Sequence, residues 1–443
     1  MEEHLRNTVF LMNPWLTEPA KWPEAALRRL PVTFIERRAY TEAGKRWRTA
    51  NKAHLVVGPR QSGKTTLIWK HLASTTGPRV LGLNLEDRRI RDWCGSAAVF
   101  VEDLRTSFGT LDALFLDEAQ HLEEAALFVK GVVDLKPGFP LLVTGSSAFH
   151  LRDRTRESLA GRATRTTLFP FAISELLDAE PPLSPAAKDE RAAAILDRHV
   201  RFGGYPEVWS AEDESGRRLA LDGLVEAFLS RDASDLFRVR RPEAMGRLIE
   251  LAARQSGSLV NLSEWAQILG ISRPTAIEYV QMLADAHLVA LVPVYARGKR
   301  VELTSANKMY FIDTGLRNAV IGDFRAPRER TDAGPLLETW VFSELVKRLG
   351  PRGGLHYWRT RSGAEVDFVV ETAHGPLGFE VKAGALASPR LSRSSRSFIE
   401  AYAPRRFFVI NETLRHADRI GRSDVRWITF LDLGRGTGLS LGT

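Results

Sequence analysis

The segment Gly58-Pro59-Arg60-Gln61-Ser62-Gly63-Lys64-Thr65 has the spacing G-x-x-x-x-G-K-[ST] of a phosphate-binding loop. An apolar run, Ala53–Val57, precedes it and a helical pattern over Thr65–Ser74 follows it, as such a loop requires. The glycines let backbone N–H groups curl around phosphate oxygens, and the N-terminus of the following helix adds positive potential. The segment therefore predicts a nucleotide site; the alternative is a chance glycine turn.

A second motif supports the first. Lys64 would reach the β- and γ-phosphates of a nucleotide, and the Thr65 hydroxyl would ligate Mg²⁺. Leu114-Phe115-Leu116-Asp117-Glu118 is an apolar run that ends in two carboxylates. Asp117 suits the hold on Mg²⁺, and Glu118 suits a residue that orients and polarises the attacking water. A capped strand end is the alternative interpretation, and the preceding loop disfavours it.

Two further polar positions are candidates for the same site. Leu141–Thr144 is another apolar run with a polar end, where Thr144 or Ser146 could contact the γ-phosphate or the attacking water. The alternative is a simple Ser/Gly turn. Arg162 could reach the nucleotide of a neighbouring subunit and offset the charge of the transition state. Because the chain contains 50 Arg residues, Arg162 could equally be an ordinary surface residue.

Short apolar runs alternate with helical patterns from Ala53 to about Leu168, which predicts βαβ units and a parallel sheet. The predicted strands are Ala53–Val57, Val80–Leu85, Leu111–Asp117 and Leu141–Thr144. Residues 1 to about 40 are expected to pack on this domain as an extension.

These motifs resemble those of one protein family. The similar segments are Gly58 to Leu67, Leu116-Asp117-Glu118-Ala119-Gln120, Thr144-Gly145-Ser146-Ser147, Leu159-Ala160-Gly161-Arg162, Phe169-Pro170-Phe171 and Gly203-Gly204-Tyr205-Pro206. From about Leu55 to about Lys382 the chain resembles prokaryotic AAA+ ATPases whose C-terminal domain has long been classed as of unknown function. The resemblance implies an AAA+ core with Walker A, Walker B and sensor-type residues, a winged-helix segment and a nuclease-like C-terminal fold.

The resemblance and the motifs together give the candidate ATPase residues. We expect ATP as the nucleotide, with Mg²⁺. The candidate catalytic residues are Lys64, Glu118 and Arg162. The candidate nucleotide-binding residues are Gly58, Pro59, Arg60, Gln61, Ser62, Gly63, Lys64, Thr65, Thr66 and Thr144.

Residues 261–285 predict two short helices separated by Gly270, with Ser272 as the cap of the second helix and Pro274 in its first turn. The apolar face of that helix is predicted to contain Ile277, Val280, Met282 and Leu283. Leu288–Tyr295 and Val301–Leu303 could be two wing strands of a winged helix.

This segment is a candidate for DNA binding. In DNA-binding winged helices the second helix enters the major groove and the wing touches phosphate. The candidate contacts are Arg273, Thr275, Arg297, Lys299 and Arg300. The alternative is a winged helix that packs on protein, because the second helix carries Glu278 and only one Arg.

The C-terminal part contains carboxylates in the D…E-x-K arrangement of metal-dependent nucleases. Asp367 lies on one predicted strand, and Glu380 and Lys382 share a face of the next, two residues apart. Two carboxylates would bind Mg²⁺, and the lysine would position or activate water. Glu338 or Glu344, from the predicted helix Leu336–Leu349, could complete the site. The alternative is a nuclease-like fold reused for binding.

The composition excludes several other classes of protein. Hydrophobic residues make up 44% and charged residues 26%, which excludes wholesale disorder, collagen and coiled coil. The single cysteine excludes an internal disulfide and fits a reducing cytosol, and the first residues are not those of a signal peptide. The net charge of +8 favours a polyanion partner, with eleven Lys/Arg against five Asp/Glu from Val381 to Thr443.

We therefore expect an α/β protein with a P-loop AAA+ parallel-sheet core, a helical and winged-helix middle segment, and an α/β restriction-endonuclease-like C-terminal domain. The expected divisions are an extension with the ATPase domain at 1–180, a helical linker at 181–258, a winged helix at 259–325 and a nuclease-like domain at 326–443. The expected function is a cytoplasmic, oligomeric ATPase that remodels or processes DNA, such as branched DNA. The alternatives are a nucleotide-controlled switch that acts through the winged helix, or an ATP-gated, Mg²⁺-dependent nuclease.

Overall fold

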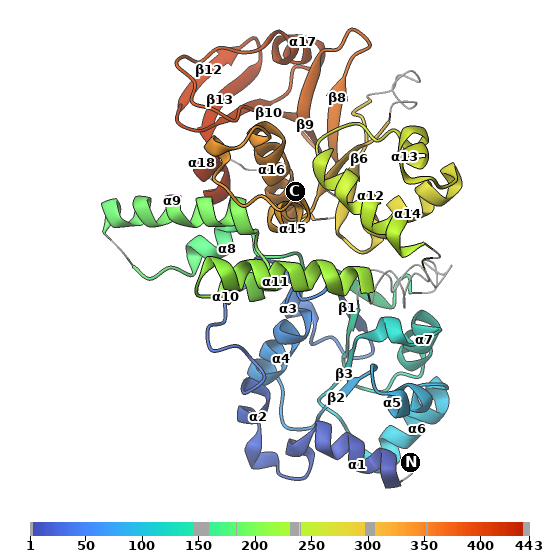
Figure 1. Ribbon diagram of the computed structural model, residues 1–443. Helices are drawn as coiled ribbons and strands as arrows, with labels where there is room; N and C mark the ends of the chain where they lie inside the picture. Colours follow the sequence, from blue (N-terminus) through green and yellow to red (C-terminus); the bar gives the residue numbers. More distant parts are fainter. Residues whose placement is uncertain are drawn as a thin grey trace. The chain divides into compact units, whose positions relative to one another are not determined.

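The structure is a computed structural model that describes residues 3–145, 159–182, 184–230, 239, 241–296, 306–350 and 353–436 (Figure 1). The chain divides into two compact units, Met1–Phe169 and Pro170–Thr443. The first unit contains one parallel sheet with helices around it. The second contains a helical segment, a two-stranded hairpin and a separate mixed sheet. This arrangement confirms the predicted α/β class and the parallel-sheet core.

The first unit alternates strands and helices along the chain. Its strands are β1 (Ala53–Val57), β2 (Val80–Asn84), β3 (Ala113–Asp117), β4 (Leu141–Gly145) and β5 (Ala163–Thr167). Its helices are α1 (Glu3–Met12), α2 (Glu24–Leu27), α3 (Arg38–Arg46), α4 (Lys64–Thr75), α5 (Arg88–Trp93), α6 (Ala97–Phe108) and α7 (Ala125–Asp134), with short 3₁₀ turns η1 (Pro14–Leu16), η2 (Pro19–Lys21) and η3 (Ala119–His121).

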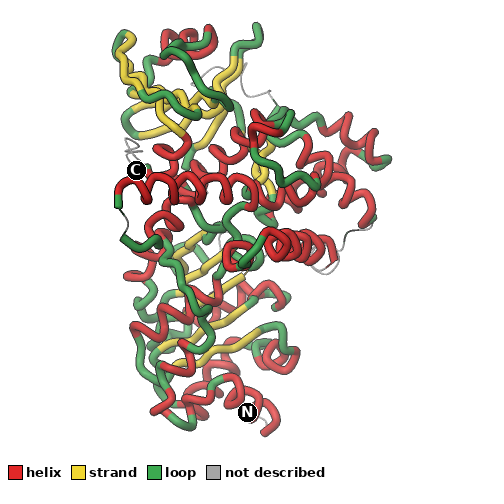
Figure 2. The backbone as a smooth tube through the Cα atoms, turned by 60° about the vertical axis from the view of Figure 1, so that its left-hand side comes forward, coloured by secondary structure: helices red, strands yellow, loops and turns green. Residues whose placement is uncertain are grey.

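All pairs in this sheet are parallel, and the strand order is β2-β3-β4-β1-β5. Figure 2 shows the strands running side by side among the helices. Because parallel strands are buried on both faces, β1 and β4 are largely apolar, and every residue of both strands is buried, including His54 and Thr144. The carboxyl ends of β1, β3 and β4 therefore meet at one edge of the sheet.

The N-terminal segment packs on this sheet. The side chain of Asn13 accepts a hydrogen bond from the Gly82 backbone N–H at 2.7 Å and donates one to the Gly82 carbonyl at 2.9 Å. The buried Trp15 indole donates to the Val80 carbonyl at 2.8 Å. These bonds to the edge strand β2 satisfy backbone groups that would otherwise have no partner within the sheet.

The second unit begins with helices and ends with a mixed sheet. The helices are α8 (Ile173–Asp178), α9 (Pro185–Phe202), α10 (Pro206–Ser210), α11 (Glu214–Ala227), α12 (Pro242–Arg254), α13 (Leu262–Leu269), α14 (Arg273–Asp285), α15 (Thr314–Ile321), α16 (Ala333–Leu349), α17 (Arg393–Tyr402) and α18 (Phe430–Arg435), with a 3₁₀ turn η6 (Pro327–Glu329). The strands are β6 (Val289–Val292), β7 (Lys308–Phe311), β8 (Leu355–Arg359), β9 (Glu365–Thr372), β10 (Gly375–Val381), β11 (Arg406–Asn411), β12 (His416–Ile420) and β13 (Ser423–Thr429).

The predicted pair of helices at 261–285 is present as α13 and α14. Gly270 ends α13 in the left-handed conformation, and the Ser272 hydroxyl accepts a hydrogen bond from the Thr275 N–H at 3.2 Å, which caps α14. Ile277 was predicted on the buried face, and this is wrong, because its side chain is 42% exposed. The 3.6-residue period instead turns Ala276, Tyr279, Val280 and Leu283 inward.

A hairpin follows these helices, and its second strand differs from the expected one. β6 pairs antiparallel with β7, whereas the predicted strand Val301–Leu303 lies outside the described residues. In the C-terminal sheet the order is β12-β13-β11-β10-β9-β8. There β8, β9 and β10 form an antiparallel meander, β11 joins β10 in parallel, and α16 packs on both β10 and β7.

A buried histidine joins three elements of the second unit. Trp340 of α16 donates its indole N–H to His199 Nδ1 at 2.8 Å, so His199 Nε2 carries the proton and donates to the Phe171 carbonyl at 2.9 Å. Burial, followed by the nearby Lys347 charge, lowers the pKa of His199 to about 3. The imidazole is therefore neutral at physiological pH and acts as a structural bridge.

This bridge predicts a pH-dependent stability. Below pH 6.5 the unfolded chain protonates His199 while the folded protein keeps it neutral, so the free energy of unfolding decreases as the pH falls toward 3. We expect a loss of about 2 kcal/mol between pH 7 and pH 5 from this group. Urea unfolding of wild type and His199→Gln at both pH values measures it. If the free energy of unfolding changed equally with pH in the two proteins, His199 would not be the group responsible.

Candidate functional site

The phosphate-binding loop connects β1 to α4 at the carboxyl edge of the parallel sheet, as its sequence predicts. Gly58 has φ +150°, and a Cβ there would lie 2.2 Å from the Leu168 carbonyl oxygen. Gly63, the residue before α4, has φ +91°. Both positions therefore require glycine, and the first turn of α4 directs its free N–H groups toward the loop.

Lys64 lies at the start of α4 with its ammonium inside the loop. Its Nζ donates to the carbonyls of Pro59 at 2.8 Å and Gly58 at 3.2 Å, and the residue is only 4% exposed. A buried ammonium next to the free N–H groups of a helix N-terminus makes a strongly anion-binding site. The Lys64 ammonium and the N-terminus of α4 thus meet at one position suited to phosphate.

The strand ends bring the predicted metal-binding and water-orienting residues together. The Thr65 hydroxyl lies 2.9 and 3.0 Å from the two carboxylate oxygens of Asp117, at the end of β3. The Thr144 hydroxyl, at the end of β4, donates to the same carboxylate and accepts the Glu118 backbone N–H at 3.0 Å. Thr144 therefore links both acidic residues, a role that its position between β1 and β3 makes possible.

Glu118 has an unusual backbone conformation. With φ 56° and ψ 46° it is left-handed, which is uncommon for a residue other than glycine and often marks a functional position. This turn directs the chain away from β3 immediately after Asp117. The amide of Gln120 donates to the Glu118 carboxylate, so Gln120 holds that side chain in position.

Asp117 and Thr65 fit a magnesium ion. Burial is the largest cause that raises the pKa of Asp117, to about 6, while the hydrogen bond from Thr144 opposes the shift. A carboxylate and a hydroxyl at one point are the oxygen donors that Mg²⁺ accepts, and the low exposure of this carboxylate favours a cation as its partner.

Arg162 lies just before β5. Its Nε pairs with Asp134 Oδ1 of the same chain at 2.5 Å, at a partly exposed position. Its role toward a neighbouring subunit stays a prediction. Ser146, the other candidate beside Thr144, lies outside the described residues.

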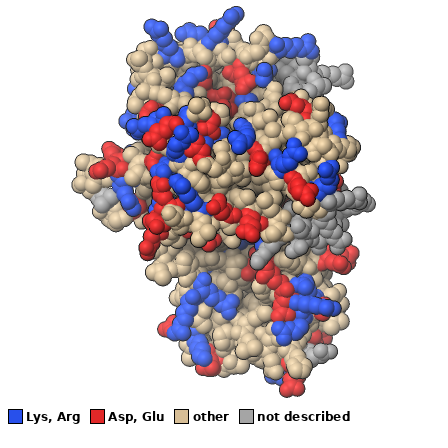
Figure 3. Space-filling view, in the orientation of Figure 1, with Lys and Arg blue, Asp and Glu red and all other residues tan. Residues whose placement is uncertain are grey.

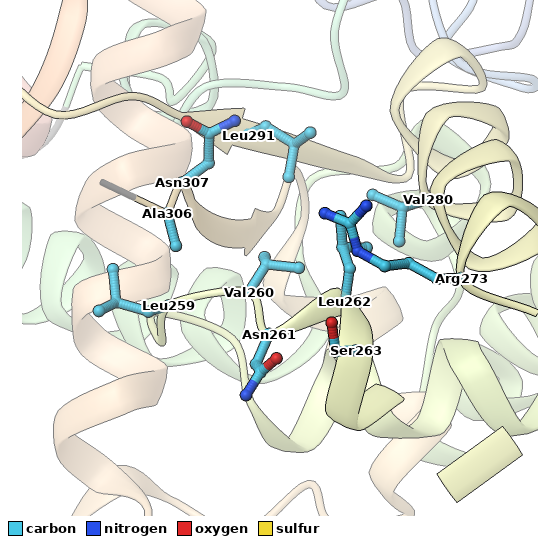
Figure 4. Close-up of a pocket in the computed structure, with 10 residues that line it drawn as sticks. All are labelled: Leu259, Val260, Asn261, Leu262, Ser263, Arg273, Val280, Leu291, Ala306 and Asn307. Carbon is cyan, nitrogen blue, oxygen red and sulfur yellow. The ribbon is translucent and has the colours of Figure 1, made fainter. Parts of the chain in front are cut away.

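The structure describes two of the five residues predicted to contact DNA, Arg273 and Thr275. Arg273 is exposed in the first turn of α14 and lines a pocket of about 610 Å³ together with Leu262, Val280 and Leu291 (Figure 4). The Thr275 hydroxyl lies 2.8 Å from that of Ser272, so Thr275 also takes part in capping the helix. The other three candidates, Arg297, Lys299 and Arg300, lie outside the described residues.

The candidate nuclease carboxylates Asp367 and Glu380 lie close enough for their charges to interact, and each also has other partners. Asp367 accepts the Val381 N–H at 2.7 Å across the β9–β10 pair, and burial, followed by the Glu338 charge, raises its pKa to about 8. Glu380 pairs with Lys382 at 2.6 Å and accepts hydrogen bonds from Ser392 and Ser395. Glu338 is near Asp367, whereas the fully buried Glu344 accepts the Ile173 N–H at 3.3 Å.

Glu338 has two unpredicted partners on β7. Lys308 Nζ lies 3.2 Å from Glu338 Oε1, and the Tyr310 hydroxyl donates to the same oxygen at 2.6 Å. Lys308 also pairs with Glu365 at 2.5 Å. Although burial lowers it, the pKa of Lys308 rises to about 12, because the charges of Glu338, Glu365 and Asp367 outweigh that effect.

Three family profiles match the chain. They are an AAA domain at residues 50–177, a domain of unknown function (DUF8612) at 193–326 and a second (DUF4143) at 333–430. The uncharacterized protein Rv2008c of Mycobacterium tuberculosis is 32% identical over 384 residues, which are 84% of this chain and 79% of that protein. The chain belongs to the family of Rv2008c.

Two further proteins are similar to this member of the Rv2008c family at lower identity. The uncharacterized protein MJ1544 of Methanocaldococcus jannaschii is 24% identical over 330 residues, 72% of each protein. The Walker-type ATPase paby2304 of Pyrococcus abyssi is 15% identical, with a TM-score of 0.44 over 65% of this chain and 96% of that chain. The AAA match confirms the predicted ATPase fold, and the DUF4143 match confirms the expected C-terminal domain of unknown function.

Sequence reasoning missed one residue that supports the nucleotide loop of this family member. The buried Arg37, from the segment before α3, donates to the Ser62 carbonyl at 3.0 Å and to the Phe169 carbonyl at 2.5 Å. The guanidinium thus ties the loop to the end of the first unit. No local pattern distinguishes Arg37 from the other arginines, because both partners are distant in sequence.

Two searches of the described residues gave negative results. No group of three or more His, Cys, Asp and Glu side chains there is arranged to hold a metal ion. Nor is any helix in the described ranges both long and apolar enough to cross a membrane.

Proposed function

We propose that the protein hydrolyses Mg–ATP and uses the energy to remodel DNA. The observation that carries the ATPase part is the junction of Thr65, Asp117, Thr144 and Glu118 beside the buried ammonium of Lys64. These are the groups that phosphoryl transfer to water requires, and three strand ends hold them together. The AAA family match supports the same activity.

Each residue has a role in this proposal. Backbone N–H groups of the loop and Lys64 bind the β- and γ-phosphates, and Glu118 orients the water that attacks the γ-phosphorus in line with the leaving oxygen. Thr65 and Asp117 would hold Mg²⁺, which when bound neutralises charge on the phosphates. Glu118 must leave Gln120 or share its carboxylate with the water. Arg162 is proposed to act on the nucleotide of a neighbouring copy in a homo-oligomer.

The DNA part of the proposal depends on the second unit. Helices α13 and α14 with the β6–β7 hairpin have the connectivity of a winged helix, which supports that interpretation. Helix α16 followed by the β8–β9–β10 meander and a parallel β11 supports a nuclease-like fold. Figure 3 shows Lys and Arg intermixed with Asp and Glu on the visible face, so we expect the DNA contacts to be local.

The test is the ATPase rate with duplex, single-stranded and junction DNA. We expect each form of DNA to stimulate ATP hydrolysis to a different extent, and junction DNA to stimulate it most. The variant Arg297→Ala/Lys299→Ala/Arg300→Ala should reduce the salt slope of DNA binding by about three. Wild-type affinity and slope in this variant, or hydrolysis indifferent to all DNA, would refute the DNA part and leave the ATPase part standing.

A nucleotide-controlled switch is the second candidate. Ile268 of α13 and Ile277 of α14 are 43% and 42% exposed, and large exposed apolar side chains favour contact with protein. In that case the helices would bind a protein partner when the nucleotide site is loaded, and DNA would not alter the hydrolysis rate.

A further inference from the structure

The carboxylates of the C-terminal domain surround a lysine that comes from another part of the chain. Glu338 lies on α16, whereas Glu365 and Asp367 lie two residues apart on β9 and therefore on the same face of that strand. Lys308 and Tyr310, also two residues apart, lie on β7 of the helix-turn-helix hairpin. The backbone N–H of Val381, on β10, also donates to Asp367. Polar groups from α16, β7, β9 and β10 therefore meet at one cluster.

The lysine is held as a buried ion. The Lys308 side chain is only 4% exposed, and its Nζ contacts Glu338 at 3.2 Å and Glu365 at 2.5 Å. An ammonium removed from water is costly unless opposite charges and hydrogen bonds surround it, and here two carboxylates do so. Arg359 adds a second positive charge, 3.4 Å from the other oxygen of Glu365.

One oxygen of Glu338 and one of Asp367 already have partners within the protein. Glu338 Oε1 accepts from both Lys308 and Tyr310, and Asp367 Oδ2 accepts the Val381 N–H. Glu380 is separately engaged by Lys382, Ser392 and Ser395. Mg²⁺ requires near-octahedral oxygens at close range, and no acidic cluster among the described residues has a metal-binding arrangement. Because the buried ammonium of Lys308 lies against Glu338 and Glu365, a divalent cation at these carboxylates would be repelled by it, and the residues present do not fit the metal of a nuclease.

We propose that Lys308 is the internal cation of this cluster. Its ammonium, held against Glu338 and Glu365, supplies the positive charge that a divalent metal would bring, so the carboxylates are structural and the C-terminal domain does not cleave DNA. The same ion pairs join the β6–β7 hairpin to α16 and β9, which makes the helix-turn-helix segment and the C-terminal sheet move as one body. The proposal is independent of ATP hydrolysis.

Metal binding tests the first part. Mn²⁺ titration of the full-length protein without added nucleotide, followed by electron paramagnetic resonance, is compared between Asp117→Asn and Asp117→Asn/Asp367→Asn, in which the metal site beside the phosphate-binding loop is silenced. We expect the same number of bound ions in both and no Mg²⁺-dependent cutting of DNA by wild type. One Mn²⁺ equivalent lost on adding Asp367→Asn, or cutting that Asp367→Asn abolishes, would overturn the proposal.

Thermal unfolding tests the second part. Lys308→Met leaves Glu338, which is 20% exposed, without its cation and leaves Glu365 with Arg359 alone, and the melting temperature should fall by about 5 °C or more. Adding Glu338→Gln should recover at least half of that loss in melting temperature. If the single variant Lys308→Met fails to fold, the double variant should fold. The control Lys21→Met removes the ion pair of Lys21 with Glu18, whose side chains are 51% and 60% exposed, and should change little. An unchanged melting temperature in Lys308→Met, or no recovery in the double variant, contradicts the proposal.

Discussion

Replacing Glu118 with Gln will leave ATP bound but will reduce its hydrolysis by about a hundredfold or more, the contribution typical of a positioned general base. The substitution keeps the shape of the side chain and removes only its negative charge. The Glu118 N–H that Thr144 accepts belongs to the backbone, so the junction of β3 and β4 stays intact. Steady-state phosphate release and nucleotide binding by calorimetry separate the two effects.

Glu123→Gln is the matched control for this prediction. Glu123 is exposed five residues further along the same connection after β3. The substitution Glu123→Gln should change neither the affinity for ATP nor the rate of its hydrolysis. Unchanged turnover in Glu118→Gln would show that another residue orients the water, and a parallel loss of ATP affinity would show that Glu118 has a structural role.

Replacing Lys64 with Ala will abolish nucleotide binding at ordinary ATP concentrations. The ammonium is buried inside the loop, where removal of one partner of a desolvated charge pair costs about 2–5 kcal/mol, or about 30-fold or more in affinity. Its two hydrogen bonds to Gly58 and Pro59 carbonyls also disappear, so the loop loses part of its own support.

The control for Lys64→Ala is Lys45→Ala, which removes an exposed lysine from the last turn of α3. Binding of a fluorescent ATP analogue should be lost in the first variant and kept in the second. If Lys64→Ala retains wild-type affinity and only turnover decreases, the lysine acts on the transition state alone.

The nucleotide site could be predicted almost completely from sequence because its determinants are local. One continuous segment supplies the loop, and Asp117 and Thr144 each end an apolar run whose burial makes the strand easy to recognise. The edge strand β5 was missed for the opposite reason. Its sequence Ala163-Thr-Arg-Thr-Thr has no buried residue, so neither alternation nor an apolar run marks it.

The long-range contacts that hold the site residues in place could not be predicted in the same way. Arg37 reaches a carbonyl 132 residues away, and Lys308 pairs with carboxylates on α16 and β9. Long-range ion pairs leave no periodic signal in a single sequence. The D…E-x-K pattern was visible, but the lysine that engages Glu338 comes from β7, which the sequence did not reveal as a strand.

The ion pairs of Lys308 with Glu338 and Glu365 also limit which substitutions the sequence can accept during evolution. Loss of Lys308 leaves Glu338 without its cation, and loss of Glu338 leaves the buried ammonium with Glu365 alone, whereas simultaneous replacement of both by apolar residues of similar volume costs less. Members of the Rv2008c family should therefore vary at these two positions in a correlated way. Where one member has lost the lysine, an apolar residue or a true metal site is expected opposite it, and that member is the one to assay for cleavage.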